Sequence, residues 1–210
     1  VMHRNREDLR LRFLIGGGDQ VYCDGVESIN IWKFLNKKIK KKKDGHPNYP
    51  SKEAMLSWFR SIYRGYWNFN PLQQIFANTP TYMMWDDHEL CDGFGSYRHD
   101  ALKEDIGEYA KLLPNLKKRH YTYEESMQVI KDMEWAAKKA YYEYQHSHNS
   151  DTSGEKESDD IMKRQWDYSV DQGHTALYFL DGRGNRDFMR PDYKVHVKEQ
   201  IDRLEKWINN

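Results

Sequence analysis

Residues 12–24 read RFLIGGGDQVYCD, a short apolar run that gives way to three glycines and then to Asp19. The apolar run is typical of a buried strand, and the glycines predict a tight loop whose backbone can approach a ligand closely. Two later runs also end in acidic residues, TYMMWDDHE at 81–89 and ALYFLDGR at 176–183. Open α/β sheets bind ligands at the carboxyl ends of their strands, so these three ends predict one shared site.

Helical periodicity fills most of the chain between and beyond these strands. Apolar residues recur at helical spacing in residues 29–39, 55–66 and 72–76. This strand–helices–strand order predicts a crossover in a largely parallel sheet, and hence an α/β fold. The remaining predicted elements are a long helix, a hairpin and a closing helix, at about 124–146, 166–180 and 197–208.

The composition is that of a folded but polar chain of 210 residues. Acidic and basic residues balance at 33 each, which gives no overall attraction to nucleic acid or to a membrane surface. Aromatic residues make up 14%, too many for a disordered chain. No apolar run approaches the roughly 20 residues of a membrane span. We therefore expect a globular domain with no membrane span and no nucleic-acid partner.

Two polar segments stand outside the helix and strand pattern. Residues 146–160 are poor in apolar residues and predict a loop or a flexible insertion. His146 and His148 within it could bind a metal, although free, solvent-exposed histidines are the more common outcome in such a setting. The lysine-rich run 37–43 could contact a polyanion, but such runs more often form a solvated surface.

The polar residues at the strand ends suit the hydrolysis of phosphate esters. Such esters resist water because their anionic oxygens repel nucleophiles, and two metal ions about 3.5–4 Å apart can clamp the phosphate and generate a bound hydroxide. Asp19, directly behind the glycines, is the candidate bridging ligand, and Asp87 is the candidate ligand of the second ion. Tyr22 could coordinate as a phenolate if one ion is of the ferric type.

Two further residues are candidates for acting on the substrate itself. His88 could steer the substrate or protonate the leaving oxygen, because imidazole titrates near neutral pH. Arg183 leaves the third strand toward the same edge, and its planar guanidinium suits the binding of phosphate oxygens. We therefore expect catalytic roles for both residues and a substrate-binding role for Arg183.

Each candidate also has an ordinary structural explanation. The aspartates of the first motif, and the pair at residues 86–87, could cap helices. Arg183 could form an ion pair with Asp181 or Asp187, and Tyr22 could be a packed aromatic residue. The hypothesis of a metal site depends on the joint appearance of these residues at three strand ends.

Together, these motifs closely resemble those of the PhoD-like (alkaline phosphatase D) branch of the calcineurin-like metallophosphoesterases. The motifs that carry the resemblance are, in chain order, GDQVYCD (18–24), WDDHE (85–89), DGFGS (92–96), AYYEYQ (140–145) and LDGRGNR (180–186). The run WDDHE is the specific one, whereas the Gly-Asp-x-x-Tyr pattern alone would be a moderate signal. The resemblance covers essentially the whole chain, as the central part of a single domain over 1–210.

The resemblance implies a metallophosphoesterase-type α/β sandwich, with two β-sheets flanked by helices. It also implies hydrolysis of small phosphomonoesters or phosphodiesters at a two-metal centre, with iron, calcium, manganese or zinc in different members. On the matching motifs, Asp19 falls at the bridging position and Tyr22 at the phenolate position of iron-using relatives. His88 matches the catalytic histidine, and Asp87 replaces the Asn of the superfamily motif Gly-Asn-His-Glu.

The outer ligand motifs of the superfamily are missing from this chain. No Asp-x-His motif precedes the first strand, and no Gly-His-x-His motif follows the third. We therefore expect a domain that is incomplete at both ends, which by itself binds metal weakly and turns over slowly. The alternative is a non-catalytic binding or scaffold domain that keeps the fold with an incomplete metal site.

Overall fold

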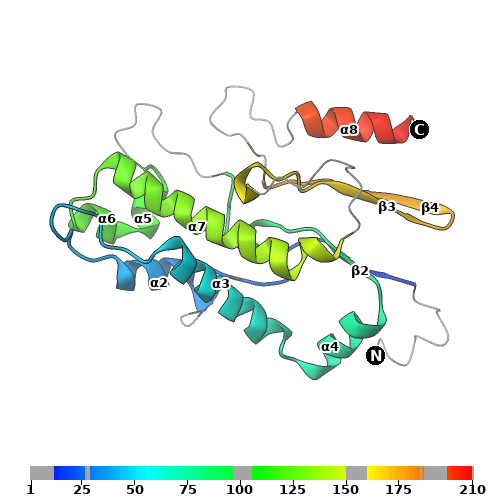
Figure 1. Cartoon of the computed structure of the whole chain (residues 1–210), viewed down its shortest axis with the longest axis horizontal. Helices are drawn as coiled ribbons and strands as arrows, with labels where there is room; N and C mark the ends of the chain where they lie inside the picture. Colours follow the sequence, from blue (N-terminus) through cyan, green and yellow to red (C-terminus); the bar gives the residue numbers. More distant parts are fainter. Residues whose placement is uncertain are drawn as a thin grey trace.

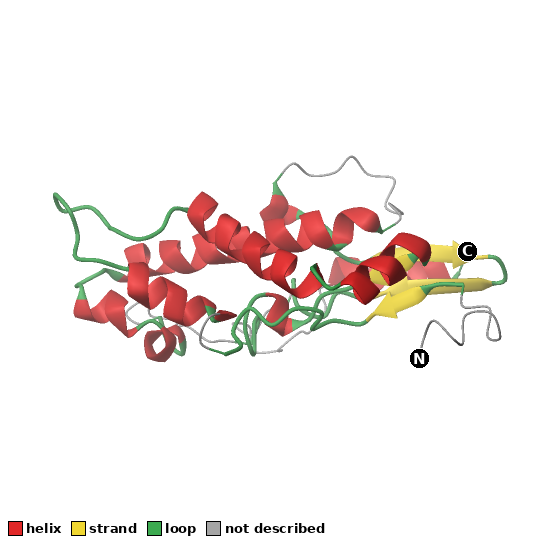
Figure 2. Cartoon of the chain, turned by 90° about the horizontal axis from the view of Figure 1, so that it is seen from below, coloured by secondary structure: helices red, strands yellow, loops and turns green. Residues whose placement is uncertain are grey.

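The structure is a computed structural model that describes residues 12–26, 29–96, 106–149, 160–184, 186 and 198–209. Its longest element, α7 (Tyr123–Tyr144), runs along the middle of an elongated molecule, with α3 (Lys52–Trp67) beside it (Figure 1). The strands gather toward one end of the molecule and helices fill the other (Figure 2).

The first two predicted strands form a small parallel sheet. β1 (Leu14–Gly16) pairs with β2 (Thr81–Met83), and Gly16 lies opposite Met83 at the carboxyl ends of the strands. The crossover between them consists of α2 (Ile31–Lys38), α3 and α4 (Asn70–Asn78). The prediction of parallel strands joined by helices is therefore confirmed.

The second half of the chain adds short helices, a hairpin and a closing helix. The short helices are α5 (Tyr109–Leu112), α6 (Pro114–Lys118) and the 3-10 turns η2 (Asp87–Glu89), η3 (His146–His148) and η4 (Ile161–Lys163). The hairpin pairs β3 (Tyr168–Gln172) with β4 (Thr175–Phe179) in antiparallel register, and α8 (Lys198–Ile208) follows. The predicted hairpin and closing helix are thus both present.

Local sequence signals set the helix starts. The side chain of Ser51 accepts a hydrogen bond from the amide of Ala54 and caps α3. At the start of α7, Thr122 caps the amide of Glu125, and the Glu125 carboxylate accepts from the amide of Thr122 in return. This reciprocal capping box satisfies two amide groups that the first helical turn leaves without partners.

The core lies between α3 and α7. Phe59 and Tyr63 of α3 and Tyr141 of α7 are fully buried. At the edge of this interface, the Arg60 guanidinium donates two hydrogen bonds, of 2.7 and 2.6 Å, to the Glu143 carboxylate. Helices α3 and α7 thus form one packed unit, and Trp85, which follows β2, stacks on Tyr141 of this unit.

The strands of the described residues form two separate two-stranded sheets. The α/β class is therefore confirmed, whereas the expected sandwich is not. In the described part of the chain, no helix has both the length and the apolar character to cross a membrane.

The predicted insertion at 146–160 begins with an ordered turn. His146 is only 8% exposed and packs among the rings of Tyr141, Trp166 and Tyr168, so the expectation that it is solvent-exposed is wrong. The aromatic residues that bury it come from elements on both sides of the insertion, which the local sequence does not reveal. His148 is exposed as expected. Residues 150–159 lie outside the described residues, so the insertion itself stays a prediction.

Candidate metal centre

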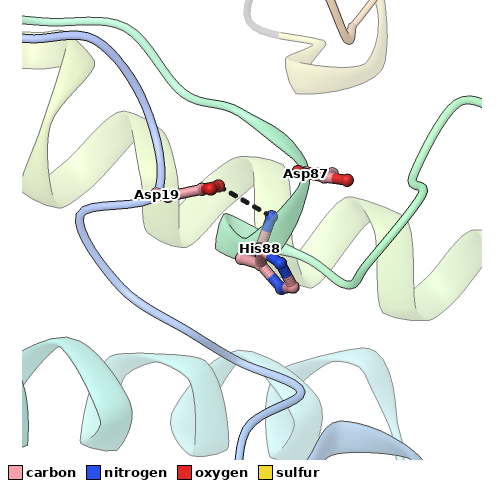
Figure 3. A group of neighbouring side chains, drawn as sticks. All are labelled: Asp19, Asp87 and His88. Atoms are coloured by element: carbon pink, nitrogen blue, oxygen red, sulfur yellow. Dashed lines mark hydrogen bonds between the residues drawn. The ribbon is translucent and has the colours of Figure 1, made fainter.

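Three of the predicted site residues come together at the carboxyl ends of β1 and β2. Asp19 follows β1, and Asp87 and His88 follow β2. Because the two parallel strands end at paired residues, both loops lie at the same edge of the sheet. One ligand atom from each of the three side chains lies within 4.8 Å of the others. Figure 3 shows the group, with the backbone amide of His88 donating a 3.3 Å hydrogen bond to Asp19 Oδ1.

A sharp backbone turn places Asp19 in this group. Gly18 has φ of 115° and Asp19 has φ of 57°, so both lie in the left-handed region. A Cβ atom at Gly18 would lie 2.5 Å from the Cβ of Asp86, which shows how closely the two loops approach. Glycine is therefore required at this position both for its conformation and for its size.

Glu89 joins the two loops to each other. Its carboxylate accepts hydrogen bonds from the amides of Asp19 (3.0 Å), Gln20 (2.8 Å) and Asp86 (2.9 Å). A fourth comes from the Gln145 side chain (3.2 Å) at the end of α7. Glu89 is 1% exposed, and burial raises its pKa to about 7 against the opposing effect of these hydrogen bonds. Glu89 was not among the predicted site residues, although its place at the end of a buried apolar run was a signal.

His88 is held by a second carboxylate that the sequence analysis did not assign to the site. Asp24 Oδ1 lies 2.7 Å from His88 Nδ1, and Asp24 Oδ2 accepts a 2.5 Å hydrogen bond from the Asp92 amide. The Asp24 contact orients the imidazole and leaves its other nitrogen, Nε2, outside this contact. Burial by itself lowers the pKa of His88. The hydrogen bond and charge of Asp24, together with the charges of Asp19 and Asp87, outweigh this effect, so the pKa of His88 is raised overall.

Tyr22 lies at the rim of the group, as the motif spacing predicts. Its hydroxyl is 3.5 Å from Asp19 Oδ2, and its ring stacks on the His88 imidazole with centroids 4.2 Å apart. The charge of Asp19 is the main cause that raises the pKa of Tyr22, with smaller effects from burial and from the Asp19 hydrogen bond. The phenol therefore stays protonated unless a cation offsets that charge.

Arg183 also reaches the site, but its guanidinium already has protein partners. It forms an ion pair with Asp86, and its Nη2 lies 3.4 Å from Asp87 Oδ2. Its Nη1 donates to the carbonyl of Phe94 at 3.1 Å. Asp181, the alternative partner, contacts Arg183 through the backbone: the Arg183 amide donates a hydrogen bond to the Asp181 carboxylate. Asp187 lies outside the described residues.

The donor set suits a cation. Burial raises the pKa of Asp19, and the charges of Asp86 and Asp87 add to the rise, while the amide and charge of His88 oppose it. Carboxylate oxygens and an imidazole that crowd together in this way match the preferences of hard and borderline metal ions. A bound cation would offset the repulsion that disfavours ionised Asp19.

A pocket of about 760 Å³ lies away from this group. It is formed by Trp67 and Phe76 on one side and by Tyr144 and His148 on the other, and no member of the acidic group lines it. The chemistry of the cluster, not the size of this pocket, therefore identifies the candidate site.

Comparison with known proteins places the sequence of this chain in a family. The sequence model of a family described as PhoD-like phosphatase matches residues 1–204. Among curated proteins, the chain is similar to "Uncharacterized protein YGR266W" of Saccharomyces cerevisiae, with 25% identity over 108 residues. That alignment covers 43% of this chain and 15% of the yeast protein, so the chain spans a small part of that relative. No solved structure gives a significant match.

Proposed function

We propose, from the premise that the chain belongs to the PhoD-like phosphatase family, that it provides the site of a phosphoric ester hydrolase. The substrates would be small phosphomonoesters or phosphodiesters. The observation that carries the proposal is the convergence of Asp19, Asp87 and His88 within 4.8 Å at two adjoining strand ends.

In this proposal Asp19, Asp87 and Tyr22 hold the metal centre, with Asp19 as the bridging ligand. Two ions, drawn from iron, calcium, manganese or zinc, would neutralise the phosphate and activate water when bound. The paired strands β1 and β2 would belong to the larger sandwich that the family resemblance implies.

The protein groups around the proposed metal centre would have separate tasks. Asp24 holds His88 by Nδ1, so that Nε2 can give a proton to the leaving oxygen. The raised pKa of His88 keeps a larger share of the imidazole protonated near neutral pH, which favours its role as an acid. Arg183, anchored by Asp86 and Asp87, would use its remaining N–H groups to bind a phosphate oxygen.

One observation favours the second candidate, a non-catalytic binding or scaffold domain. The Arg183 guanidinium contacts both Asp86 and Asp87, and a positive charge there competes with a metal ion for the carboxylates. In the scaffold alternative Arg183 replaces the cation and stabilises the loop without any hydrolysis.

Metal binding and turnover distinguish the two candidates. We expect the chain to bind Mn²⁺, Zn²⁺, Ca²⁺ or Fe ions weakly and to hydrolyse p-nitrophenyl phosphate or a bis-ester analogue slowly when metal is added; brisk turnover at full metal occupancy would contradict this expectation. Asp19→Ala and Asp87→Ala should each abolish metal binding and activity, whereas His88→Ala should mainly lower turnover. The matched control is Asp171→Ala, which removes an exposed carboxylate from the hairpin.

Measured metal content and activity could contradict the proposal in three ways. Normal metal content and rate in Asp19→Ala would refute the bridging role. Absence of metal from the wild-type chain, together with metal binding after Arg183→Ala, would favour the scaffold. A single bound ion with full activity would reject the two-metal part of the proposal.

A further inference from the structure

Two basic runs that are far apart in the sequence form one surface in the fold. The first is residues 37–43, which contain six lysines, and the second is residues 117–120, Lys-Lys-Arg-His. The first run begins in the last turn of α2 and the second at the end of α6, and both lie at the end of the molecule opposite the hairpin (Figure 1). We call this combined surface the basic end.

Side-chain contacts fix the two runs against each other. The Asn36 amide donates to the carbonyl of Leu112 at 2.6 Å, and the Asn115 amide donates to the carbonyl of Asn36 at 2.6 Å. On the other side, the Tyr121 hydroxyl donates to the carbonyl of Lys40 at 3.3 Å. The basic end is therefore a defined surface and not the chance approach of two loose segments.

The positive charge of the basic end is largely uncompensated. Its exposed lysines are Lys37, Lys38, Lys40, Lys41, Lys43, Lys117 and Lys118. Lys42 differs from these, because it pairs with Glu125 at 2.7 Å. Asp44, which follows the first run, does not balance these seven lysines, and Glu125 is already paired with Lys42, although the chain as a whole has a formal net charge of +0. Such a one-sided distribution in a neutral chain produces a strong local field.

We propose that the basic end binds the surface of an anionic phospholipid bilayer. Its charges are mostly lysine ammonium groups, which attract anions over a distance but lack the planar fork by which arginine recognises single phosphates. A cluster of four to eight such charges is typical of proteins that bind anionic lipid headgroups.

The chemistry of the surface favours a bilayer over single-stranded nucleic acid. Nucleic-acid grooves combine basic residues with aromatic rings on which bases stack. Tyr121, whose hydroxyl contacts the first run, is only 9% exposed and is covered by Lys42. The described exposed large hydrophobic residues lie elsewhere in the chain, so attachment would be electrostatic and reversible.

Co-sedimentation with vesicles tests the proposal on the full 210-residue chain. We expect binding to vesicles of phosphatidylcholine with 30% phosphatidylserine at low salt, and loss of binding in 0.5 M salt. Each lysine near an anionic bilayer contributes roughly a factor of five, so Lys41→Glu with Lys118→Glu should weaken binding at least about 30-fold. The matched control, Lys163→Glu with Lys206→Glu, changes the same number of exposed charges away from the basic end and should bind nearly as the wild type does.

Three outcomes would overturn the proposal. They are no binding of the wild type to the anionic vesicles, equal binding to vesicles of pure phosphatidylcholine, and an equal loss in both double variants. Tighter binding to a single-stranded RNA oligonucleotide than to the vesicles at the same salt would replace the bilayer with a nucleic acid. Circular dichroism of each variant shows that a lost interaction does not reflect unfolding.

Discussion

At the scale of single residues, two carboxylates outside the proposed set of metal ligands hold the candidate site in place. Glu89 binds the amides of both loops, and Asp24 orients the imidazole of His88. Both act through the residues they hold, so they are positioning residues in the proposed hydrolase. Their charges also set the pH behaviour of the site.

The pKa of Glu89 predicts how stability depends on pH. Because the pKa of Glu89 is about 7 in the fold and about 4.5 in the unfolded chain, the folded state binds more protons between these pH values. The free energy of unfolding of the metal-free chain should therefore fall as the pH rises from about 4.5 to 7, by up to about 3 kcal/mol from this group. His88, whose pKa is also raised, acts in the same direction above pH 6.5.

Urea unfolding in EDTA at several pH values measures this dependence. Glu89→Gln cannot ionise and should flatten the pH dependence, whereas Glu205→Gln, a change in an exposed residue of α8, should leave the dependence unchanged. An identical slope in Glu89→Gln and the wild type would show that Glu89 does not titrate in this range.

Asp24 should control the pH profile of turnover. The proposed acid, His88, must be protonated, so kcat should fall as the pH rises through its pKa. Asp24→Asn removes the charge that raises this pKa, so the falling limb should move to lower pH and kcat should drop. The control is Asp92→Asn, which alters a neighbouring exposed carboxylate. A falling limb that stays in place in Asp24→Asn would exclude His88 as the titrating acid.

At the scale of elements, the glycine loop after β1 determines whether Asp19 reaches the site. Gly18 needs a left-handed backbone and lies against Asp86, whereas Gly17 has open space where a Cβ atom would go. The two neighbouring glycines therefore provide a matched pair for a test of the loop.

Gly18→Ala should destabilise the chain and weaken metal binding, because the loop must move away from Asp86. We expect a loss of about 2 kcal/mol in the free energy of unfolding, from the strained φ and the close contact together. Gly17→Ala should stay within about 0.5 kcal/mol of the wild type. Urea unfolding and metal titration measure both effects, and equal results for the two variants would show that the loop conformation is not constrained.

At the scale of the whole molecule, the closing helix is fastened to the hairpin by a network of polar contacts. Arg203 of α8 donates hydrogen bonds of 2.8 and 2.5 Å to Asp167, which is 2% exposed. Gln200 donates to the carbonyl of Asp181 at 3.0 Å and accepts from its amide at 2.7 Å. Asp181 also accepts from the indole of Trp85, so α8 is linked to the strand that leads to the site.

Arg203→Ala should loosen α8 because it leaves the buried Asp167 without its cation. Since Arg203 is itself partly exposed, we expect a moderate loss of about 1–2 kcal/mol, less than for a fully buried pair. Lys198→Ala, which breaks the exposed pair with Asp202, should change the melting temperature little. Fluorescence of Trp207, whose ring lies 5.4 Å from that of Tyr178, would report the detachment. An equal effect of both variants would refute the anchoring role.

The sequence by itself determined the elements and the acidic strand ends. Apolar periodicity is a local property, so it indicated the hairpin, the parallel crossover and all the helices except the short α5 and α6, and the strand ends placed Asp19, Asp87 and His88 at one edge. Only the tertiary structure decided which groups hold them: Glu89 between the loops, Asp24 on the imidazole and Arg183 on the aspartates. These contacts join residues about 65 to 100 positions apart, as do those that bring the two basic runs together. Such pairings depend on how the elements pack, and no local pattern in a single sequence encodes them.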